Sequence, residues 1–132
     1  MRFHLVLVLP FFIPLCFINY VATSHCLTHQ QFLLLNVKHN LVFNTVKSEK
    51  LIHWNQSCDC CQWNGVTCNE GRVVGLDLSE QFITGGLDNS SLFKLQYLQE
   101  LNLAHNDFGS VIPSKFGLLK NLRYLNLSNA GF

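Results

Sequence analysis

Apolar residues recur at a fixed spacing along the C-terminal half of the chain. Residues 95–108, LQYLQELNLAHNDF, align with residues 119–132, LKNLRYLNLSNAGF, at an offset of 24. A weaker copy, VVGLDLSEQFI, begins at Val73, which lies 25 residues before its equivalent, Leu98. The alignment superposes three sets of apolar residues: Val73, Leu76, Leu78 and Ile83; Leu98, Leu101, Leu103 and Phe108; Leu122, Leu125, Leu127 and Phe132. In each copy two leucines alternate with polar residues, which disfavours an amphipathic helix and predicts a short, half-buried strand.

This spacing is the period of leucine-rich repeats, in which each copy supplies one strand to a stack. Leu101 and Leu103 are expected to point inward while Glu100, Asn102 and Ala104 point outward, and each strand pairs in parallel with the next. Because no single repeat can bury its own apolar face, the copies must stack. The predicted fold class is α/β, a solenoid of short parallel β-strands.

The outward residues are expected to form rows across a concave surface, while Leu98, Phe108 and Ile112 fill the interior from the flanking turns. Mixed polar and aromatic side chains on a rigid curved sheet suit the recognition of a protein or a peptide. For any single position, a merely solvated surface is the simpler interpretation. The candidate binding residues are Asp77, Glu100, Asn102, Tyr124 and Asn126.

The stretch before the repeats has the features of a cap that covers the first turn of the stack. Residues 28–31, THQQ, fit a capping box, so a helix is expected to start there. Its apolar side is expected to consist of Phe32, Leu34, Leu35, Val37, Leu41 and Val42. Residues 65–68 and 72–74 bracket Asn69-Glu70-Gly71, which predicts a hairpin with a glycine at positive φ. Trp54 and Trp63 are expected to cover the end of the core.

The N-terminus has the pattern of a secretory signal peptide. Arg2 precedes an apolar stretch at residues 5–18, and Ala22-Thr23-Ser24 offers small residues for cleavage before His25. An uncleaved anchor is the alternative. The predicted segments are a signal peptide at 1–24, a disulfide-linked cap at 25–70 and about two and a half repeats at 71–132. The last repeat is incomplete, which is typical of a fragment of a longer protein.

Charge and cysteine content narrow the function further. The eight Lys and Arg residues after position 24 are spread thinly, which disfavours nucleic-acid binding. In a secreted chain the cysteines are expected to form disulfides, and Cys58, Cys60, Cys61 and Cys68 lack the spacing of a zinc site. Neither a catalytic motif nor a cofactor-binding motif is recognisable, so we expect no enzyme, no cofactor and no bound metal.

From Cys26 onward the chain resembles the plant extracellular leucine-rich-repeat proteins. The resemblance rests on FLLLNVKHNL, LIHWN, the cap motif DCCQWNGVTC and the later NDFGSVIP. The stretches LFKLQYLQELNLAHNDF and NLRYLNLSNAGF look most like receptor-like proteins of the Verticillium-wilt-resistance type. In such repeats the side chain at the position of Asn106 forms hydrogen bonds with the neighbouring backbone inside the turn. Gln81 and Ala130 hold that position in the other copies, so we expect an incomplete ladder of these bonds.

The resemblance also implies two disulfides in the cap, Cys26 with Cys60 and Cys61 with Cys68. Cys58 departs from the family pattern. It has three alternatives: a free thiol, a bond to another chain, or competition for Cys26. We favour the free thiol.

The functional expectation from the resemblance is a receptor-like protein at the cell surface that senses an extracellular ligand, often in defence, and signals through partner receptor kinases. Its membrane anchor would lie in a segment absent from this chain. The alternative is a secreted inhibitor of a microbial cell-wall enzyme, similar to the polygalacturonase-inhibiting proteins. Sequons at Asn55, Asn89 and Asn126 are candidate glycosylation sites. A glycan on Asn126 would cover part of the concave row.

Overall fold

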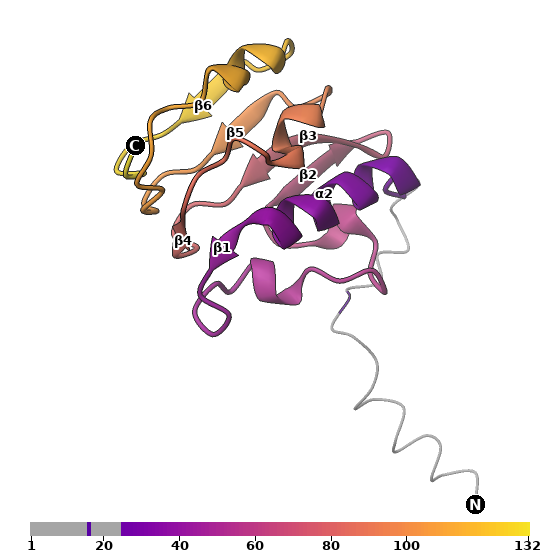
Figure 1. Cartoon of the computed structure of the whole chain (residues 1–132). Helices are drawn as coiled ribbons and strands as arrows, with labels where there is room; N and C mark the ends of the chain where they lie inside the picture. The colour runs from indigo at the N-terminus through magenta and orange to yellow at the C-terminus, as the bar shows by residue number, and fades with distance from the viewer. Residues whose placement is uncertain (1–15, 17–24) are drawn as a thin grey trace, which may run out of the picture.

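The computed structural model describes Cys16 and residues 25–132, which fold around one sheet (Figure 1). The strands of this sheet lie in the order β2-β3-β5-β6, with β2 antiparallel to β3 and the other pairs parallel. Their bounds are β2, Val66–Asn69; β3, Arg72–Asp77; β5, Glu100–Asn102; and β6, Tyr124–Asn126. Among the described residues, no helix is both long and apolar enough to cross a membrane.

The register of the parallel strands confirms the predicted stack. Leu76 pairs with Leu101, and Leu101 pairs with Leu125, so equivalent leucines of successive repeats are neighbours. Leu101, Leu103 and Phe108 are buried under the sheet. The alternating pattern fits parallel strands whose inner face is covered by the connections between them and whose outer face is exposed. The solenoid class and its repeat period are therefore confirmed.

Three side chains of the repeats lie differently from the prediction. Ala104 was expected on the outer surface but is buried, because its strand has already ended and turned inward. Ile112 was expected in the interior but is 58% exposed, and Pro113 beside it is buried instead. Leu125 is 40% exposed, since β6 is the last strand of the sheet and has a strand neighbour on one side only.

The predicted hairpin before the first repeat is confirmed, with a tighter turn than expected. Asn69 pairs with Arg72 as the last residue of β2, which leaves Glu70 and Gly71 as a two-residue turn. Both have positive φ, 52° and 77°, as a type I′ turn requires. This turn type matches the twist of the two strands that it joins.

Helix α2, Thr28–Asn40, packs its buried side against the core and starts where the sequence predicted. The expected capping box is absent, because Thr28 is already helical and Leu27 occupies the cap position without a side-chain bond. The buried side chains of the helix are Gln30, Leu33, Leu34 and Val37. Phe32 and Val42, which were assigned to the apolar side, are 58% and 63% exposed.

A second, two-stranded sheet joins the cap to the first repeat. Strand β1, Val42–Phe43, pairs antiparallel with β4, Ile83–Thr84. The sequence pattern does not predict this sheet, since each strand is only two residues long. On the other side of the cap, the rings of Trp54 and Trp63 stack at 5.2 Å and are both buried, so they cover the end of the core as predicted.

Candidate ligand-binding face and disulfide cap

The outer face of the sheet, which we define as the side turned away from the leucines, carries two in-register rows. The first row consists of Asp77, Asn102 and Asn126. Together with Glu100 and Tyr124 of the second row, these are the five predicted binding residues. In the first row each Oδ1 accepts a hydrogen bond of 3.0 Å from the backbone N–H two residues later, at Ser79, Ala104 and Ser128. These side chains therefore shape the turn that ends each strand.

The second row, Gly75, Glu100 and Tyr124, makes no such turn bonds. Glu100 is exposed and Tyr124 is 50% exposed. Gly75 has no side chain, and a Cβ there would lie 3.1 Å from Cβ of Thr67 in β2. The missing side chain helps to form a hollow of about 530 Å³ over the first strands, lined by Thr67, Gly75, Glu100 and Tyr124 among others. Glu100 and Tyr124 are thus the predicted residues whose side chains stay available to a ligand.

Lys50 connects the cap to this face. Its ammonium lies 3.3 Å from Oδ1 of Asp77 and donates a 3.0 Å hydrogen bond to the Asp77 carbonyl. Partial burial raises the pKa of Asp77, but the Ser79 hydroxyl and amide and the Lys50 ammonium outweigh it, so the pKa lies below its ordinary value. Asp77 therefore stays ionised and partly neutralised, which leaves Glu100 as the free carboxylate of the hollow.

A neighbouring hollow of about 490 Å³ shares Lys50 and Asn64 with the first one. Its wall includes Phe82, which is 52% exposed. The Lys47 Nζ lies over the Phe82 ring, 5.6 Å from the ring centroid. Phe82 has a positive φ of 56°. The sequence does not predict this hollow, because its lining comes from cap and repeat segments that lie far apart in the sequence.

The backbone at Phe82 is explained by Asn106. Oδ1 of Asn106 accepts hydrogen bonds from the amides of Gln81 and Ile83, at 3.1 and 3.0 Å, so the two N–H groups that flank Phe82 converge on one oxygen. Nδ2 of Asn106 donates to the carbonyls of Leu78 and Leu103, at 2.9 and 3.0 Å. One side chain thus satisfies the turns of two adjacent repeats.

Gln81 extends these bonds into the cap, so the expected gap in the ladder does not occur there. Its Oε1 accepts a 2.9 Å bond from the Lys50 amide, and its Nε2 donates to the carbonyl of Ser79 at 3.1 Å. The fully buried Ser48 donates its hydroxyl proton to the Gln81 carbonyl. Only Ala130 leaves the ladder incomplete, because it has no side-chain amide.

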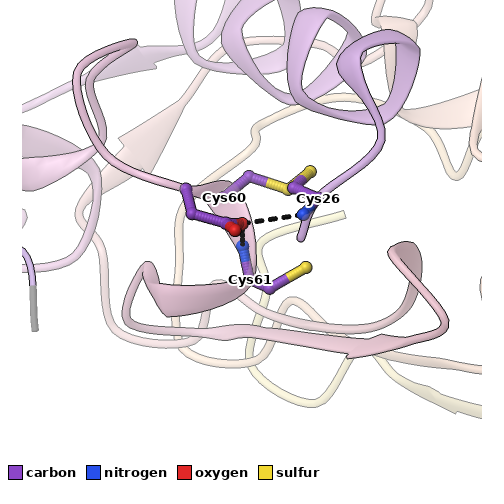
Figure 2. A group of neighbouring side chains, drawn as sticks. Cys26, Cys60 and Cys61 are labelled. Carbon is purple, nitrogen blue, oxygen red and sulfur yellow. Dashed lines mark hydrogen bonds between the residues drawn. A yellow bond between two sulfur atoms is a disulfide. The ribbon is translucent and has the colours of Figure 1, made fainter. Parts of the chain in front are cut away.

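The cap is held by disulfides that converge on one carboxylate. Cys26 is bonded to Cys60 and Cys61 to Cys68, each with Cα atoms 5.5 Å apart. Oδ1 of Asp59 accepts hydrogen bonds from the amides of Cys26 and Cys61, both at 2.9 Å, which are drawn dashed in Figure 2. Oδ2 of Asp59 lies 2.9 Å from Nδ1 of His25.

The environment of Asp59 favours its ionised form. Partial burial raises the pKa of this carboxyl, but the amides of Cys61 and Cys26 and the His25 ring outweigh burial, so its pKa lies below the ordinary value. Asp59 also lies with Cys26, Cys60 and Cys61 in a group whose ligand atoms are within 4.8 Å of one another. The three sulfurs belong to disulfides and are not thiolates, so this group has no set of metal ligands.

The preference for a free thiol at Cys58 is wrong. Cys58 is buried and bonded to Cys16, with Cα atoms 5.5 Å apart, and all six cysteines are in disulfides. Cys16 was not expected as a partner because it lies in the segment assigned to the signal peptide. Apart from Cys16, that segment lies outside the described residues. A chain cleaved before His25 would lose Cys16. Cleavage at this site is therefore incompatible with a Cys16–Cys58 bond within one polypeptide.

The three sequons differ in accessibility. Asn89 is exposed. Asn55 is half-buried, and its side chain bonds the His53 carbonyl and the Ser57 amide. Asn126 is half-buried on β6, where Oδ1 accepts the Ser128 bonds and Nδ2 lies 3.3 Å from the Tyr124 hydroxyl. Glycosylation at these positions stays a prediction.

Two protein-family models match the chain in succession. The leucine rich repeat N-terminal domain matches residues 27–69, and the leucine rich repeat model matches residues 72–131. The boundary between the two matches falls in the turn between β2 and β3. The matched family is non-enzymatic, in agreement with the prediction that the chain is not an enzyme.

Curated relatives are plant receptor-like proteins. Receptor-like protein 7 of Arabidopsis thaliana is 45% identical over 124 residues, which is 89% of this chain and 12% of that protein. The receptor-like protein Cf-9 homolog of Solanum lycopersicum is 49% identical over 72 residues, 52% of this chain and 8% of that protein. The chain thus spans a small fraction of their lengths. These relatives support the receptor-like class without singling out the Verticillium-wilt-resistance type.

Solved structures share the fold. The Arabidopsis receptor kinase HAESA, solved with the peptide hormone IDA and the co-receptor SERK1, superposes with a TM-score of 0.65 at 30% identity, covering 78% of this chain and 17% of that one. A plant ice-binding protein gives a TM-score of 0.65 at 27% identity, covering 77% and 33%. Because one fold serves a receptor and an ice-binding protein, the fold alone does not define the ligand. The chain belongs to the leucine-rich-repeat proteins, and it carries the N-terminal cap and first repeats of the plant receptor-like proteins.

Proposed function

We propose that the chain is part of the extracellular region of a plant receptor-like protein, and that the outer face of its sheet binds an extracellular protein or peptide. The observation that carries the proposal is the in-register row that presents Glu100 and Tyr124 beside an open hollow. Similarity to Receptor-like protein 7 over most of the chain supports the cellular role.

The shape and chemistry of the face favour a polypeptide ligand. Small-molecule sites are enclosed and mostly apolar, whereas this hollow is open and has a carboxylate and a phenol at its edge. The turn bonds of Asp77, Asn102 and Asn126 keep the neighbouring row rigid, so binding costs little conformational entropy there. A half-exposed tyrosine on a rigid strand is a typical interface anchor.

The finer expectations belong to the same proposal. They are a cell-surface location on the extracellular face of the plasma membrane, a role in defence, and signalling through partner receptor kinases. The solved HAESA complex contains a peptide hormone and a co-receptor, which supports this mode of action for a related ectodomain. The resemblance of residues 92–108 and 121–132 to the Verticillium-wilt-resistance type is retained as a subtype within the proposal.

Glycosylation bears directly on the proposed face. A glycan on Nδ2 of Asn126 would rise next to the Tyr124 ring and cover that edge of the row. We therefore expect Asn89 to carry glycan and Asn126 to remain free in the secreted protein. Glycopeptide mass spectrometry of protein secreted from plant cells measures the occupancy at each sequon. Full occupancy of Asn126 would contradict binding over Tyr124.

A peptide-display selection tests the proposed face. Peptides are selected on the full chain and then measured on a double variant, Glu100→Lys with Tyr124→Ala. We expect dissociation constants to rise about tenfold or more, as for the loss of an interface anchor. Lys94→Ala, on the exposed far side of the first complete repeat, is the control and should leave binding unchanged. Peptides that bind the double variant as tightly as the wild type would reject the face.

The alternative function, inhibition of a microbial cell-wall enzyme, has a direct assay. The full chain is added in excess to a purified fungal polygalacturonase acting on polygalacturonic acid. On the receptor proposal we expect unchanged release of reducing sugars. Stoichiometric inhibition would favour the inhibitor instead.

A further inference from the structure

Three cysteines crowd into four residues of the cap, yet each has a different partner. Cys58 pairs with Cys16, Cys60 with Cys26, and Cys61 with Cys68. The loop from Cys26 to Cys60 spans 34 positions, and shifting the bond to Cys58 or Cys61 would change that span by only two or one. Loop-closure entropy varies with the logarithm of length, so it does not distinguish these pairings.

The hydrogen bonds of Asp59 distinguish between these alternative cysteine pairings. One carboxylate oxygen holds the amides of both Cys26 and Cys61 at 2.9 Å, and these residues belong to different disulfides. Figure 2 shows the Cys26–Cys60 bond, the separate sulfur of Cys61, and the two dashed hydrogen bonds that end on the amides of Cys26 and Cys61. The Cys61 sulfur is bonded instead to Cys68 of β2. Gln31 of helix α2 fixes the third amide, because its Oε1 accepts a 2.8 Å bond from Cys60.

We propose that Asp59 is a positioning residue for disulfide formation, and that its carboxylate selects Cys60 as the partner of Cys26 and reserves Cys61 for Cys68. With Asp59 bound to both amides, the Cys26 backbone is held opposite Cys60, while the Cys61 side chain is turned toward β2. Asp59 also caps the short 3₁₀ turn at Cys60–Gln62, which sets the direction of the two adjacent side chains.

The chemistry is a thiol–disulfide exchange that consumes one small disulfide, for which oxidised glutathione serves as the oxidant. The Cys60 thiolate attacks glutathione disulfide, forms a mixed disulfide and releases one glutathione. The Cys26 thiolate then attacks the Cys60 sulfur and releases the second glutathione, which takes up a proton from solvent. Two protein thiols lose two electrons and two protons, and the glutathione disulfide gains both.

Once the bonds have formed, the negative charge of Asp59 opposes their reduction. Its carboxylate is within 4.8 Å of the three sulfurs of its group, so it disfavours the thiolates that reduction would create there. Thiols with a high pKa are poor leaving groups in exchange, because the leaving group departs as a thiolate. The selected bonds are therefore also protected against later rearrangement toward Cys58.

The test is disulfide mapping of the full chain, reduced and reoxidised in a glutathione buffer, quenched with an alkylating agent at several times. In Asp59→Ala we expect the fraction with both Cys26–Cys60 and Cys61–Cys68 to fall about tenfold, as for lost hydrogen bonds to a charged group. Asp59→Asn keeps an Oδ1 acceptor and should retain most of the wild-type pairing. Mapping reads covalent pairs and does not depend on a folded product.

Asn44→Ala is the matched control for general loss of stability. The Oδ1 of Asn44 also accepts two backbone hydrogen bonds in the cap, from Val46 and Lys47 at 2.9 and 2.8 Å, but it lies away from the cysteines. We expect its disulfide map to match the wild type. Equal mispairing in Asn44→Ala, a wild-type map in Asp59→Ala, or mispairing in Asp59→Asn as large as in Asp59→Ala would each overturn the proposal.

A second background isolates the choice between the adjacent cysteines. In Cys58→Ser the third competitor is removed, and adding Asp59→Ala should still produce Cys26–Cys61 bonds. Native pairing in this double variant would reject the selection between Cys60 and Cys61. The result does not depend on ligand binding, so it stands or falls separately from the proposed receptor function.

Discussion

The cap, matched over residues 27–69, and the repeats, matched over residues 72–131, bury leucines in one core but hold them by different means. The repeats use parallel strands in register and one side chain, Asn106, that bonds the backbone of two turns. The cap has no repeated unit, and it combines disulfides, stacked tryptophans and the side chains of Gln30, Gln31 and Asp59.

This difference reflects the geometry of each region. A repeat finds its hydrogen-bond partners on a neighbour of the same shape, so one pattern serves every turn. The cap must match a repeat on one side only, and its backbone groups need individually placed partners. Gln30 illustrates this: its buried side chain in helix α2 accepts a 2.9 Å bond from the amide of Val73 in β3. Covalent bonds then stabilise a region that has a neighbouring repeat on one side only.

The largest expected effect comes from breaking the longer cap disulfide. Replacing both Cys26 and Cys60 by serine opens a loop of 34 positions and should lower the free energy of unfolding by about 4 kcal/mol on the loop-entropy model. Urea unfolding followed by tryptophan fluorescence measures this change, because Trp54 and Trp63 lie in the cap. Replacing Cys61 and Cys68, seven positions apart, should cost only about 2.5 kcal/mol. Equal costs would contradict the entropic account.

The next effect tests the repeats. Asn106→Ala removes the partner of two backbone amides and two turn carbonyls, and should cost about 3 kcal/mol because buried polar groups are left unsatisfied. The exposed Asn121, which bonds only the Gln96 carbonyl, is the matched control, and its replacement by alanine should cost under about 0.5 kcal/mol. Similar denaturation midpoints for the two variants would show that the ladder contributes little.

A smaller effect is expected where cap and repeats join. Gly71 has a φ of 77°, and a Cβ there would meet the carbonyl of His25. Gly71→Ala should therefore cost about 1 to 2 kcal/mol. Gly117 has open space around it and serves as the control, since Gly117→Ala should be neutral or slightly stabilising. Thermal unfolding by circular dichroism compares both variants, and an unchanged midpoint for Gly71→Ala would contradict a strained turn.

The smallest effect is a pH dependence shared by both regions. The pKa values of Asp59 in the cap and Asp77 in the repeats lie below the ordinary 3.8, so each stabilises the fold above that pH and loses its contribution as the pH falls through its lowered pKa. In the Asp59→Asn and Asp77→Asn variants, the free energy of unfolding should fall less steeply below about pH 4 than it does in the wild type. Denaturation midpoints between about pH 5 and pH 2 measure the slopes, and wild-type slopes in both variants would contradict the lowered pKa values.

The outer face shows why part of the candidate site was predictable. The alternating pattern correctly assigned Glu100 and Tyr124 to the sheet surface, since side-chain direction in a strand follows position. The pattern did not show that Asp77, Asn102 and Asn126 are bonded within their own turns. A polar residue two positions before each turn amide was visible in the sequence, and that spacing is the signal that could have identified the turns.

The sequence by itself determined the solenoid, its period, the hairpin and the burial of the leucines in the first two repeats, because these depend on hydrophobic periodicity and local turn chemistry. Tertiary structure alone decided the β1–β4 sheet, the role of Gln81, the hollow between cap and repeats, and the pairing of Cys58 with Cys16. Each of these joins residues about 30 to 40 positions apart, and no local pattern in the chain encodes which distant atoms will meet.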